Sequence, residues 1–253
     1  MNSGARKLSG SFLTPQWLAP PGVRALVTLR RGGASAAPWD SFNLGDHVGD
    51  AVSAIATNRA LLRRHLPAAP HWLRQVHGTR CVDALHAASD NAADASFTRQ
   101  RGVVCAVLTA DCLPVLLCDE AAQVVAAAHA GWRGLAAGVI ESTVAAMNAP
   151  PGQLMAWLGP AIGPAAFEVG DDVRAAFVAH DPAAADAFVP TQAGKWLCNI
   201  PLLARQRLQA LGLHRIVSVD FCTVRDHADF FSYRRDGITG RMASCIWLED
   251  GFS

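Results

Sequence analysis

Short apolar runs separated by tight turns dominate the middle of the chain. Residues 103–108, 115–118 and 124–128 are almost wholly apolar, and Asp119-Glu120 separates the last two runs. Apolar runs of this length suit strands that are covered on both faces. The pattern therefore predicts a buried sheet in the centre of the fold.

Helical spacing of apolar residues predicts a helix from Asp50 to about His65. Asp50 is expected to cap it, because its carboxylate can accept free N–H groups of the first turn. Gly78-Thr79 is a turn site, which predicts a hairpin joining residues 71–76 to 80–85. Further helices are predicted at about 136–147, 171–180 and 201–211, and further strands at 23–29, 154–158, 216–220 and 243–248. This interleaving predicts a layered α/β or α+β sandwich with a mixed β-sheet core flanked by helices.

The length and composition are typical of a folded globular protein. The length of 253 residues suits one large domain or two small ones, and the 51% of hydrophobic and 17% of charged residues exclude disorder. We expect one domain spanning residues 1–253. Residues 1–20 are irregular and are expected to form a loose N-terminal arm, with Trp17 as its anchor. The net charge of +1 gives no basic excess for nucleic acid.

The sequence shows neither a secretory signal nor a membrane span, which predicts a cytoplasmic location. The N-terminus lacks the apolar stretch of a secretory signal, and no window reaches the ~18 apolar residues of a membrane span. The seven cysteines are odd in number and include no CxxC pair. We therefore expect free thiols in a cytoplasmic protein that binds neither nucleic acid nor membrane. The sequence leaves the oligomeric state open.

Three segments place metal-competent side chains where a predicted strand meets a turn. They are RQVHG, TADCLP and HAGWRG, which carry His77, Cys112 and His129. Two imidazoles and one thiolate satisfy three positions of a tetrahedral zinc ion and leave a fourth for water or substrate. The gaps of 35 and 17 residues are unlike a compact zinc finger, so hydrogen-bonded structural histidines are the alternative. Copper also suits these ligands.

Motifs along nearly the whole chain resemble one family. From about Ser41 onward they are SFNLGDHVGD, NRALL, WLRQVHG, AVLTADCLPVLLCD, AAAHAGWRGLAAGVI, LGPAIGPAAFEVGDDV, CTVRDHADFFSYRRDG and TGRMASCIWL. They are similar to the YfiH-like family, also called the laccase-domain or polyphenol-oxidase-type family. The resemblance implies one metal, usually zinc, held by His77, Cys112 and His129. It also implies a layered sandwich distantly similar to cytotoxic necrotizing factor-type cysteine hydrolases.

The resemblance implies several activities. One is phosphorolysis of adenosine, inosine and methylthioadenosine to the base and ribose 1-phosphate or methylthioribose 1-phosphate. Adenosine deamination, copper-dependent polyphenol oxidation and peptidoglycan editing are the others. The chain has nine histidines and no His-x-His pair, so one such site does not make a multicopper cluster.

Further residues are candidates for the chemistry, each with a structural alternative. Asp111 is a candidate proton shuttle, or else a turn-forming residue. Arg133 is a candidate phosphate ligand, or else a surface ion-pair partner. Gln75 is expected to orient a metal ligand, or else to lie on the surface. Asn43 is expected to shape a turn near the cleft, and Asn43 and Gln75 are also predicted to bind substrate. Tyr233 and Arg234 match family motifs and are expected to line the substrate pocket.

Four hypotheses follow. The first is a metal-dependent purine nucleoside phosphorylase with adenosine deaminase activity, using small-molecule nucleosides and phosphate. The second is a cysteine hydrolase or amidase that edits peptidoglycan precursors, with Cys112 and His129 as a thiolate–imidazolium pair. The third is a single-copper polyphenol oxidase. The fourth is a non-catalytic module with a structural zinc ion.

Overall fold

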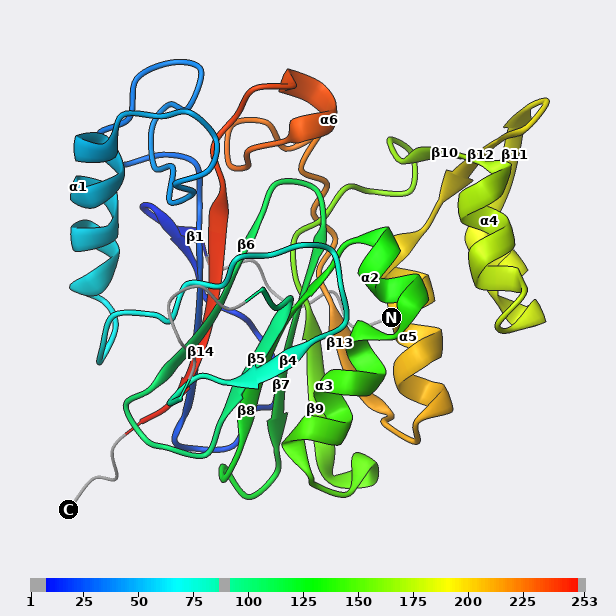
Figure 1. The fold of residues 1–253 in the computed structure, drawn as a ribbon, viewed down its shortest axis with the longest axis horizontal. Coiled ribbons are helices and arrows are strands. Elements are labelled where there is room, and N and C mark those ends of the chain that lie inside the picture. The colour runs from blue at the N-terminus through cyan, green and yellow to red at the C-terminus, as the bar shows by residue number, and fades with distance from the viewer. Residues whose placement is uncertain (1–7, 87–91, 250–253) are drawn as a thin grey trace.

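The computed structural model describes residues 8–86 and 92–249, whose strands form two large sheets and one small sheet (Figure 1). The first large sheet is antiparallel throughout, in the order β1-β2-β3-β14-β6. Its strands are β1 (Leu8–Ser9), β2 (Phe12–Leu13), β3 (Val23–Thr28), β14 (Met242–Leu248) and β6 (Val104–Thr109).

The second large sheet is mixed and has the order β13-β9-β7-β8-β5-β4. Its outer pairs, β13 with β9 and β5 with β4, are parallel, and the inner pairs are antiparallel. Its strands are β4 (Cys81–Asp83), β5 (Ala95–Thr98), β7 (Leu113–Asp119), β8 (Val125–Ala130), β9 (Leu154–Leu158) and β13 (Arg215–Ser218).

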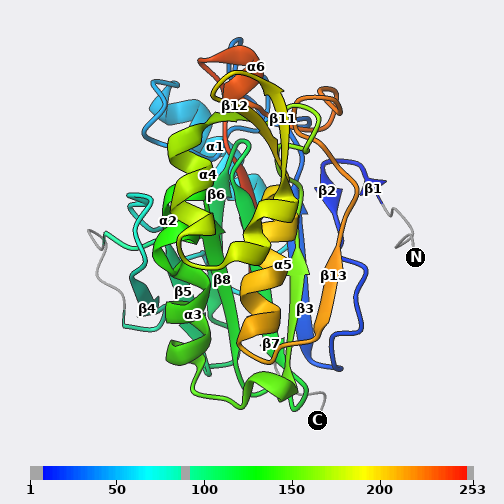
Figure 2. The same ribbon diagram turned by 90° about the vertical axis from the view of Figure 1, so that its right-hand side faces the viewer.

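A small antiparallel sheet lies beside α4 at the edge of the molecule (Figures 1 and 2). Its strands are β10 (Glu168–Gly170), β12 (Lys195–Cys198) and β11 (Phe188–Gln192). The α-helices are α1 (Val52–Arg63), α2 (Trp132–Ala137), α3 (Val139–Met147), α4 (Asp171–Val178), α5 (Ile200–Ala210) and α6 (Tyr233–Asp236). Short 3-10 helices span Pro151–Gln153 and Pro182–Ala187.

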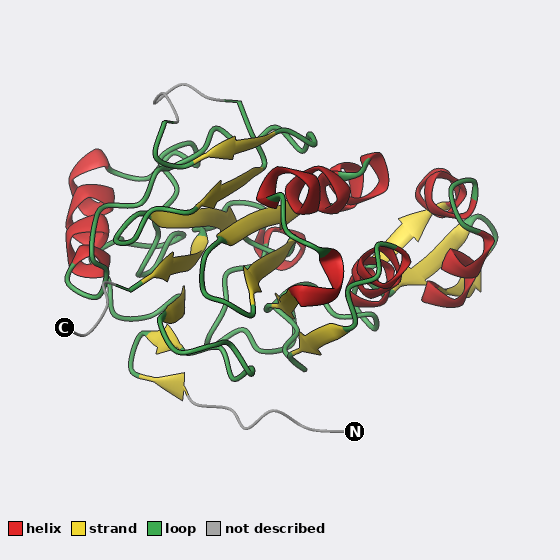
Figure 3. Ribbon diagram, turned by 90° about the horizontal axis from the view of Figure 1, so that it is seen from below, coloured by secondary structure: helices red, strands yellow, loops and turns green. Residues whose placement is uncertain are grey.

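The two large sheets pack face to face, and helices cover their outer faces (Figure 3). Because side chains alternate along a strand, β7 serves two cores. Val115 and Leu117 face α3 and α5, whereas Leu116 packs against the other sheet. On the far side, Leu62 of α1 packs with Val104 and other residues of the antiparallel sheet. The result is a sandwich of helix, sheet, sheet and helix layers, which confirms the predicted fold class.

Most predicted elements are present with small changes of boundary. The structure confirms the strands predicted at 23–29, 103–108, 115–118, 124–128, 154–158, 216–220 and 243–248, and the helices predicted at 50–65, 171–180 and 201–211. The described part of the predicted N-terminal arm forms β1 and β2, which attach to β3, and Trp17 packs against the core between the sheets. No helix in the described ranges is long and apolar enough to cross a membrane.

The predicted hairpin between residues 71–76 and 80–85 is wrong. The first segment makes isolated bridges, and β4 pairs in parallel with β5 instead. The Asp94 carboxylate accepts the backbone N–H groups of residues 76–78, which a hairpin ladder would need. The local turn signal was therefore overridden by one buried carboxylate.

Two details of the predicted helices are also wrong. The single helix predicted at 136–147 is two helices, α2 and α3, because Gly138 takes a left-handed conformation with φ of 107°. Asp50 does not cap α1, whose N-cap residue is Ala51. The Asp50 carboxylate instead accepts hydrogen bonds from the side chains of Ser35 and Asn43, at 2.6 and 2.9 Å.

Candidate metal centre

His77, Cys112 and His129 meet at one end of the mixed sheet. Their potential ligand atoms all lie within 4.8 Å of one another. Cys112 Sγ is 3.8 Å from His77 Nε2, and the two imidazole rings meet nearly edge to face at 76°. The fold therefore brings together the three residues that the sequence predicted as metal ligands.

Strand register explains how Cys112 reaches this position. β7 and β8 are antiparallel and Leu113 pairs with Ala130, so Cys112 lies opposite Gly131. A Cβ atom at Gly131 would lie 2.9 Å from His77 Cδ2 and 3.0 Å from Cys112 Sγ. Contacts this short are strongly repulsive, so a glycine is required for the thiol and imidazole to approach each other.

Two non-glycine residues at the centre have left-handed backbones, with φ of 59° for His77 and 97° for Asp111. Such conformations cost about 1–3 kcal/mol each and persist where the surroundings fix them. The buried Asp111 carboxylate accepts hydrogen bonds from the Thr223 hydroxyl at 2.5 Å and from the Arg234 backbone N–H at 2.6 Å. These contacts hold the strained residue just before Cys112.

Asp94 is fully buried and serves two of the three candidate ligands. Its Oδ1 atom lies 2.8 Å from His129 Nδ1 and accepts the His77 backbone N–H at 2.9 Å. Its Oδ2 atom accepts the N–H groups of Val76 and Gly78 at 3.1 and 2.7 Å. One carboxylate thus orients the His129 ring and fixes the strained loop that carries His77. With Nδ1 bound to Asp94, Nε2 of His129 is the nitrogen left for a metal.

Charges at the centre favour the thiolate form of Cys112. Burial alone would raise the pKa of this thiol, but the positive charge of His129 and hydrogen bonds from His129 and His77 lower its pKa to about 6. Burial opposes the charged form of His129 too, yet the Cys112 thiolate and the Asp94 carboxylate raise its pKa to about 9. Burial of Asp94 is outweighed by hydrogen bonds from His129 and the backbone, so its pKa is lowered.

This donor set fits a single metal ion. A thiolate and two imidazoles would fill three positions of a tetrahedral zinc site and would leave the fourth for water or substrate. The carboxylate on the far nitrogen of His129 is the partner that metal-bound imidazoles usually have. The same ligands also suit copper, so the donor set alone leaves the metal identity open.

Two cavities share the candidate centre. The polar cavity, about 320 Å³, is lined by the three candidate ligands together with His47, Gln75, Leu108, Thr109, Ala110, Tyr233 and Arg241. The apolar cavity, about 140 Å³, is lined by Ala110, Asp111, Cys112, Trp132, Ile162, Phe167, Ile200, Tyr233 and Arg234. Ala110, Cys112 and Tyr233 line both, so the thiol lies where a polar space meets an apolar one.

Comparison with known proteins assigns the family. The model of the family described as "Multi-copper polyphenol oxidoreductase laccase" matches residues 24–249. The chain belongs to this family. Its motif resemblance to the YfiH-like proteins is confirmed by relatives about half identical to it.

Curated members of the laccase-domain family match almost end to end. "Purine nucleoside phosphorylase PA4543" of Pseudomonas aeruginosa is 52% identical over 95% of this chain and 99% of its own. "Purine nucleoside phosphorylase YfiH" of Escherichia coli is 51% identical over 94% and 98% of the two chains. Both proteins carry the name of a phosphorylase, whereas the family description names an oxidase.

Solved structures in the family share the fold. Protein NMB0706 of Neisseria meningitidis has a TM-score of 0.92 at 50% identity, covering 95% of this chain and 100% of its own. YlmD of Geobacillus stearothermophilus has a TM-score of 0.90 at 30% identity, covering 99% and 100%. The layered arrangement is therefore that of the laccase-domain family.

The family description names several copper ions, but the ligands here form one cluster. Within residues 8–86 and 92–249, His77, Cys112 and His129 are the one group of three or more His, Cys, Asp or Glu side chains placed to share a metal. A multicopper oxidase spreads electrons over several ions that need many imidazoles. The described donor set fits one ion.

Three of the predicted substrate-binding residues line the cavities. Tyr233 is exposed and lines both of them, and Arg234 lines the apolar cavity with its guanidinium over the ring of Phe167. Gln75 lines the polar cavity, but its amide donates to the Leu108 carbonyl at 2.8 Å and accepts the Leu108 N–H at 2.7 Å. Gln75 therefore attaches the His77 loop to β6.

The two other predicted residues lie outside the cavity walls. Asn43 is fully buried and lines neither cavity; it closes a turn on Gly45 and accepts the Arg241 backbone N–H at 2.9 Å. Arg133 is exposed, stacks 4.3 Å from the centre of the Trp132 ring and lines neither cavity. Direct substrate contact by Asn43 is excluded by its burial, because all of its polar atoms are bound within the protein.

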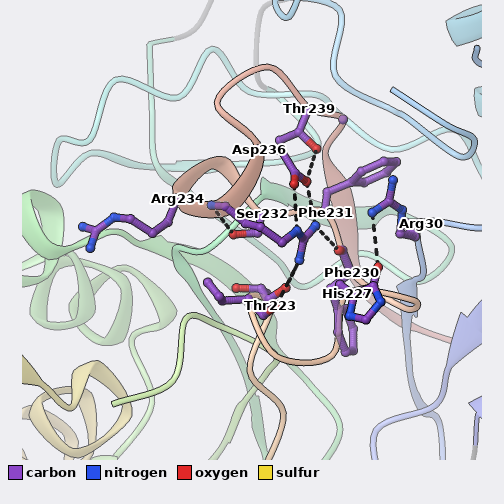
Figure 4. A network of polar contacts seen from close by, with 12 residues as sticks. Arg30, Thr223, His227, Phe230, Phe231, Ser232, Arg234, Asp236 and Thr239 are labelled. Atoms are coloured by element: carbon purple, nitrogen blue, oxygen red, sulfur yellow. Dashed lines mark hydrogen bonds and ion pairs between the residues drawn. The ribbon is translucent and has the colours of Figure 1, made fainter. Parts of the chain in front are cut away.

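A hydrogen-bond network fixes α6, which carries Tyr233 and Arg234, against the segment before it (Figure 4). The Arg235 side chain donates to the carbonyl oxygens of Thr223 and Phe230 at 2.6 and 3.1 Å. It also pairs with the Asp236 carboxylate at 2.6 Å. These bonds hold α6 against residues 223–230, which gives the cavity wall a defined shape.

Sequence reasoning missed Asp94 and Arg241. Asp94 lies 17 residues after His77 and 35 before His129, so no local motif joins it to either. Arg241 stands inside the TGRMASCIWL motif, and its presence there was the available signal. Its side chain lines the polar cavity together with the three candidate ligands.

Proposed function

We propose that the protein is a metal-dependent purine nucleoside phosphorylase that also deaminates adenosine. The observation that carries this proposal is the position of the candidate metal centre between an apolar and a polar cavity. A nucleoside has the same division, because its base is flat and apolar on both faces and its sugar is polar. The phosphorylase names of the curated relatives support the same activity.

The apolar cavity suits the purine base. Trp132 and Phe167 offer aromatic surface, and Ile162 and Ile200 add aliphatic contacts. Asp111 is the carboxylate in this lining, so we assign it the proton transfer that the leaving base or the deaminated amino group requires. Its bonds to Thr223 and Arg234 keep it in place for that role.

The polar cavity suits the ribose and the attacking nucleophile. Tyr233 lies on the border of the two cavities, where the glycosidic bond would lie. Zinc in this centre would supply a Lewis acid that polarises substrate and lowers the pKa of water. The protein's own part is to hold the three ligands, keep a proton between His129 Nδ1 and Asp94, and orient the substrate.

The decisive experiment measures products and metal in the same sample. Zinc-loaded protein is incubated with adenosine, inosine or methylthioadenosine, with and without phosphate, and products are separated by chromatography. We expect free base and the sugar 1-phosphate only when phosphate is present. Inosine formed from adenosine without phosphate would establish deamination. Metal-loaded protein that does neither would rule out this function.

Cys112→Ala tests the role of the thiolate. We expect this variant to lose bound metal and phosphorolysis together, because one of three ligands is removed. Cys81→Ala is the matched control, since that thiol lies on β4 outside both cavities. Activity lost with metal fully retained would instead favour direct attack by the thiol.

One observation favours a second candidate, a cysteine hydrolase or amidase acting on peptidoglycan precursors. Cys112, His129 and Asp94 are arranged as nucleophile, base and orienting carboxylate, and the Cys112 pKa of about 6 favours the thiolate. His77→Ala separates the two functions. Metal-dependent phosphorolysis should fall with metal content in this variant, whereas thiol-dependent amide hydrolysis should survive chelation and be blocked by a thiol-alkylating reagent.

The third candidate activity is copper-dependent polyphenol oxidation. It is tested by incubating copper-loaded protein with a phenolic substrate. We place the activity in the cytoplasm, with a purine nucleoside and phosphate as partners. All seven cysteines are free thiols, which suits a reducing compartment.

A further inference from the structure

Arg241 is the cation among the described residues that line the polar cavity beside the candidate metal centre. It directly precedes β14 and lines the same cavity as His77, Cys112 and His129. Among the described residues that line that cavity, none is an aspartate or a glutamate. Arg241 therefore brings a positive charge to the cavity that the three candidate ligands line.

The surrounding residues fix the position of Arg241. The Arg241 backbone N–H donates to Asn43 Oδ1 at 2.9 Å. The Arg241 Nη1 atom donates to the carbonyls of Thr239 and Gly240, both at 3.0 Å. A Cβ atom at Gly45 would lie 2.7 Å from Arg241 Cγ, so glycine leaves the space through which the side chain passes. Within the described residues, Nε and Nη2 have no acceptor, and these two groups form the fork that binds an oxyanion.

Electrostatics at this cavity favours an anion. Burial lowers the pKa of Arg241, and the neighbouring Cys112 and Asp111 only partly offset the cost of burying its charge. A divalent metal on the neutral imidazoles would add two positive charges near the guanidinium, which the Cys112 thiolate and the Asp94 carboxylate behind His129 offset. His47 lines the same cavity as Arg241. The Arg241 guanidinium and a metal ion with an open coordination position can both contact one tetrahedral oxyanion.

We propose that Arg241 and the fourth position of the metal centre form the binding site for inorganic phosphate. The sequence had suggested Arg133 for this role, but Arg133 lines neither cavity and stacks on Trp132. The site holds phosphate next to the space assigned to the ribose. Its place in catalysis rests on the proposed phosphorylase function, but its affinity for phosphate does not.

The test is calorimetric titration of zinc-loaded protein with inorganic phosphate, with sulfate as an unreactive analogue. Because charge-assisted hydrogen bonds contribute about 1.5–3 kcal/mol, Arg241→Gln should raise the phosphate Kd by about 10- to 100-fold. Arg241→Lys keeps the charge but loses the fork, so its Kd should lie between those of the wild type and Arg241→Gln. Arg133→Gln tests the competing assignment, and Arg64→Gln is the control for loss of an exposed charge.

Metal content and Tm are measured for every variant, so that loss of folding is not mistaken for loss of binding. Gly45→Ala is a second variant that displaces Arg241 without changing its charge, and it should also weaken phosphate binding. Wild-type affinity in a folded, metal-loaded Arg241→Gln protein would overturn the proposal, as would a loss confined to Arg133→Gln. A protein that binds phosphate through Arg241 but releases no base would refute the phosphorylase function and leave the anion site standing.

Discussion

At the scale of single residues, Asp94 decides the geometry of the candidate metal centre. Its carboxylate contacts the His129 ring and the His77 backbone, so it links two ligands that are 52 residues apart in sequence. The three ligands were predictable, because metal-competent side chains stood where strands met glycine turns. Asp94 was not, because a carboxylate in an irregular segment is normally a surface residue. Only the fold shows that it is fully buried.

Asp94→Asn should weaken metal binding by about 10- to 100-fold, as expected for loss of the carboxylate that supports a metal-bound imidazole. The amide has one acceptor oxygen, so it cannot both receive the His129 proton and bind all three backbone N–H groups of the His77 loop. Competition with a chromophoric zinc chelator measures the affinity. Asp186→Asn is the control, since Asp186 is exposed and remote from the cavities. Equal affinity in both variants would contradict the role assigned to Asp94.

Gly131→Ala should separate the ligands without changing their chemistry. The added methyl would lie 2.9 Å from His77 Cδ2 and 3.0 Å from Cys112 Sγ, so one of them must move. We expect metal affinity to fall at least 10-fold and the fold to be retained. Gly152→Ala is the matched control, because a Cβ atom there meets nothing within 4 Å. Chelator competition and Tm are measured on both variants, and an unchanged metal affinity in Gly131→Ala would show that the centre tolerates a wider spacing.

At the scale of elements, apolar runs predicted the central strands because both faces of β6 to β9 are buried. The pattern missed β11, which shows mostly exposed residues and belongs to a small edge sheet. It also missed β5, whose four residues include two polar ones. The false hairpin at 71–85 had correct local turn chemistry, and Asp94 overrode it through contacts that no sequence window contains.

The break between α2 and α3 depends on Gly138, and it gives a prediction about stability. Its φ of 107° lies in a region that other residues reach only with strain. Gly138→Ala should therefore lower the free energy of unfolding by about 1–2 kcal/mol. Gly152→Ala again serves as the control, with an ordinary backbone and open space. Denaturant unfolding measures both. A stabilised Gly138→Ala protein would mean that the chain can form the single long helix that its sequence pattern suggested.

The ion pair in α6, the helix that carries Tyr233, should make the stability of the protein depend on pH. Hydrogen bonds from Arg235 lower the pKa of Asp236 from 3.8, despite partial burial. A carboxyl whose pKa is depressed on folding stabilises the protein above its unfolded pKa and loses that effect as the pH falls through the folded value. Asp236→Asn should thus be less stable than wild type by up to about 1 kcal/mol at pH 7, since the pair is partly exposed.

Denaturant unfolding of wild type and Asp236→Asn across pH 2–7 measures this difference. The gap between the two proteins should be constant from neutral pH to about pH 5, because the wild-type carboxyl is charged there in both folded and unfolded states. It should shrink below 3.8, the ordinary pKa of the carboxyl. A gap that persisted undiminished at the lowest pH would show that the Asp236 charge is not its source.

At the scale of the whole molecule, the candidate centre lies where the ends of both large sheets meet. His129 is in β8, Cys112 precedes β7 and Asp94 precedes β5, and these three strands are neighbours in the mixed sheet. Arg241 precedes β14, which lies beside β6 in the antiparallel sheet. The sequence predicted the layers but not this meeting point, because it depends on strand order. A metal here would connect β8, the start of β7 and the segment that carries His77 before β4.

Removing the metal should therefore destabilise the entire fold. A ligand that binds only the folded state adds about 2.7 kcal/mol when its free concentration is 100 times its Kd. At about 2–4 °C per kcal/mol for a chain near this size, chelation should lower Tm by several degrees. The same chelator should leave the Tm of Cys112→Ala unchanged, because that variant lacks one of the three ligands. Cys81→Ala should respond like wild type. An equal fall in Tm for Cys112→Ala would place the stabilising metal outside the His77, Cys112 and His129 cluster, and the activity assigned to that cluster would then have to be sought elsewhere.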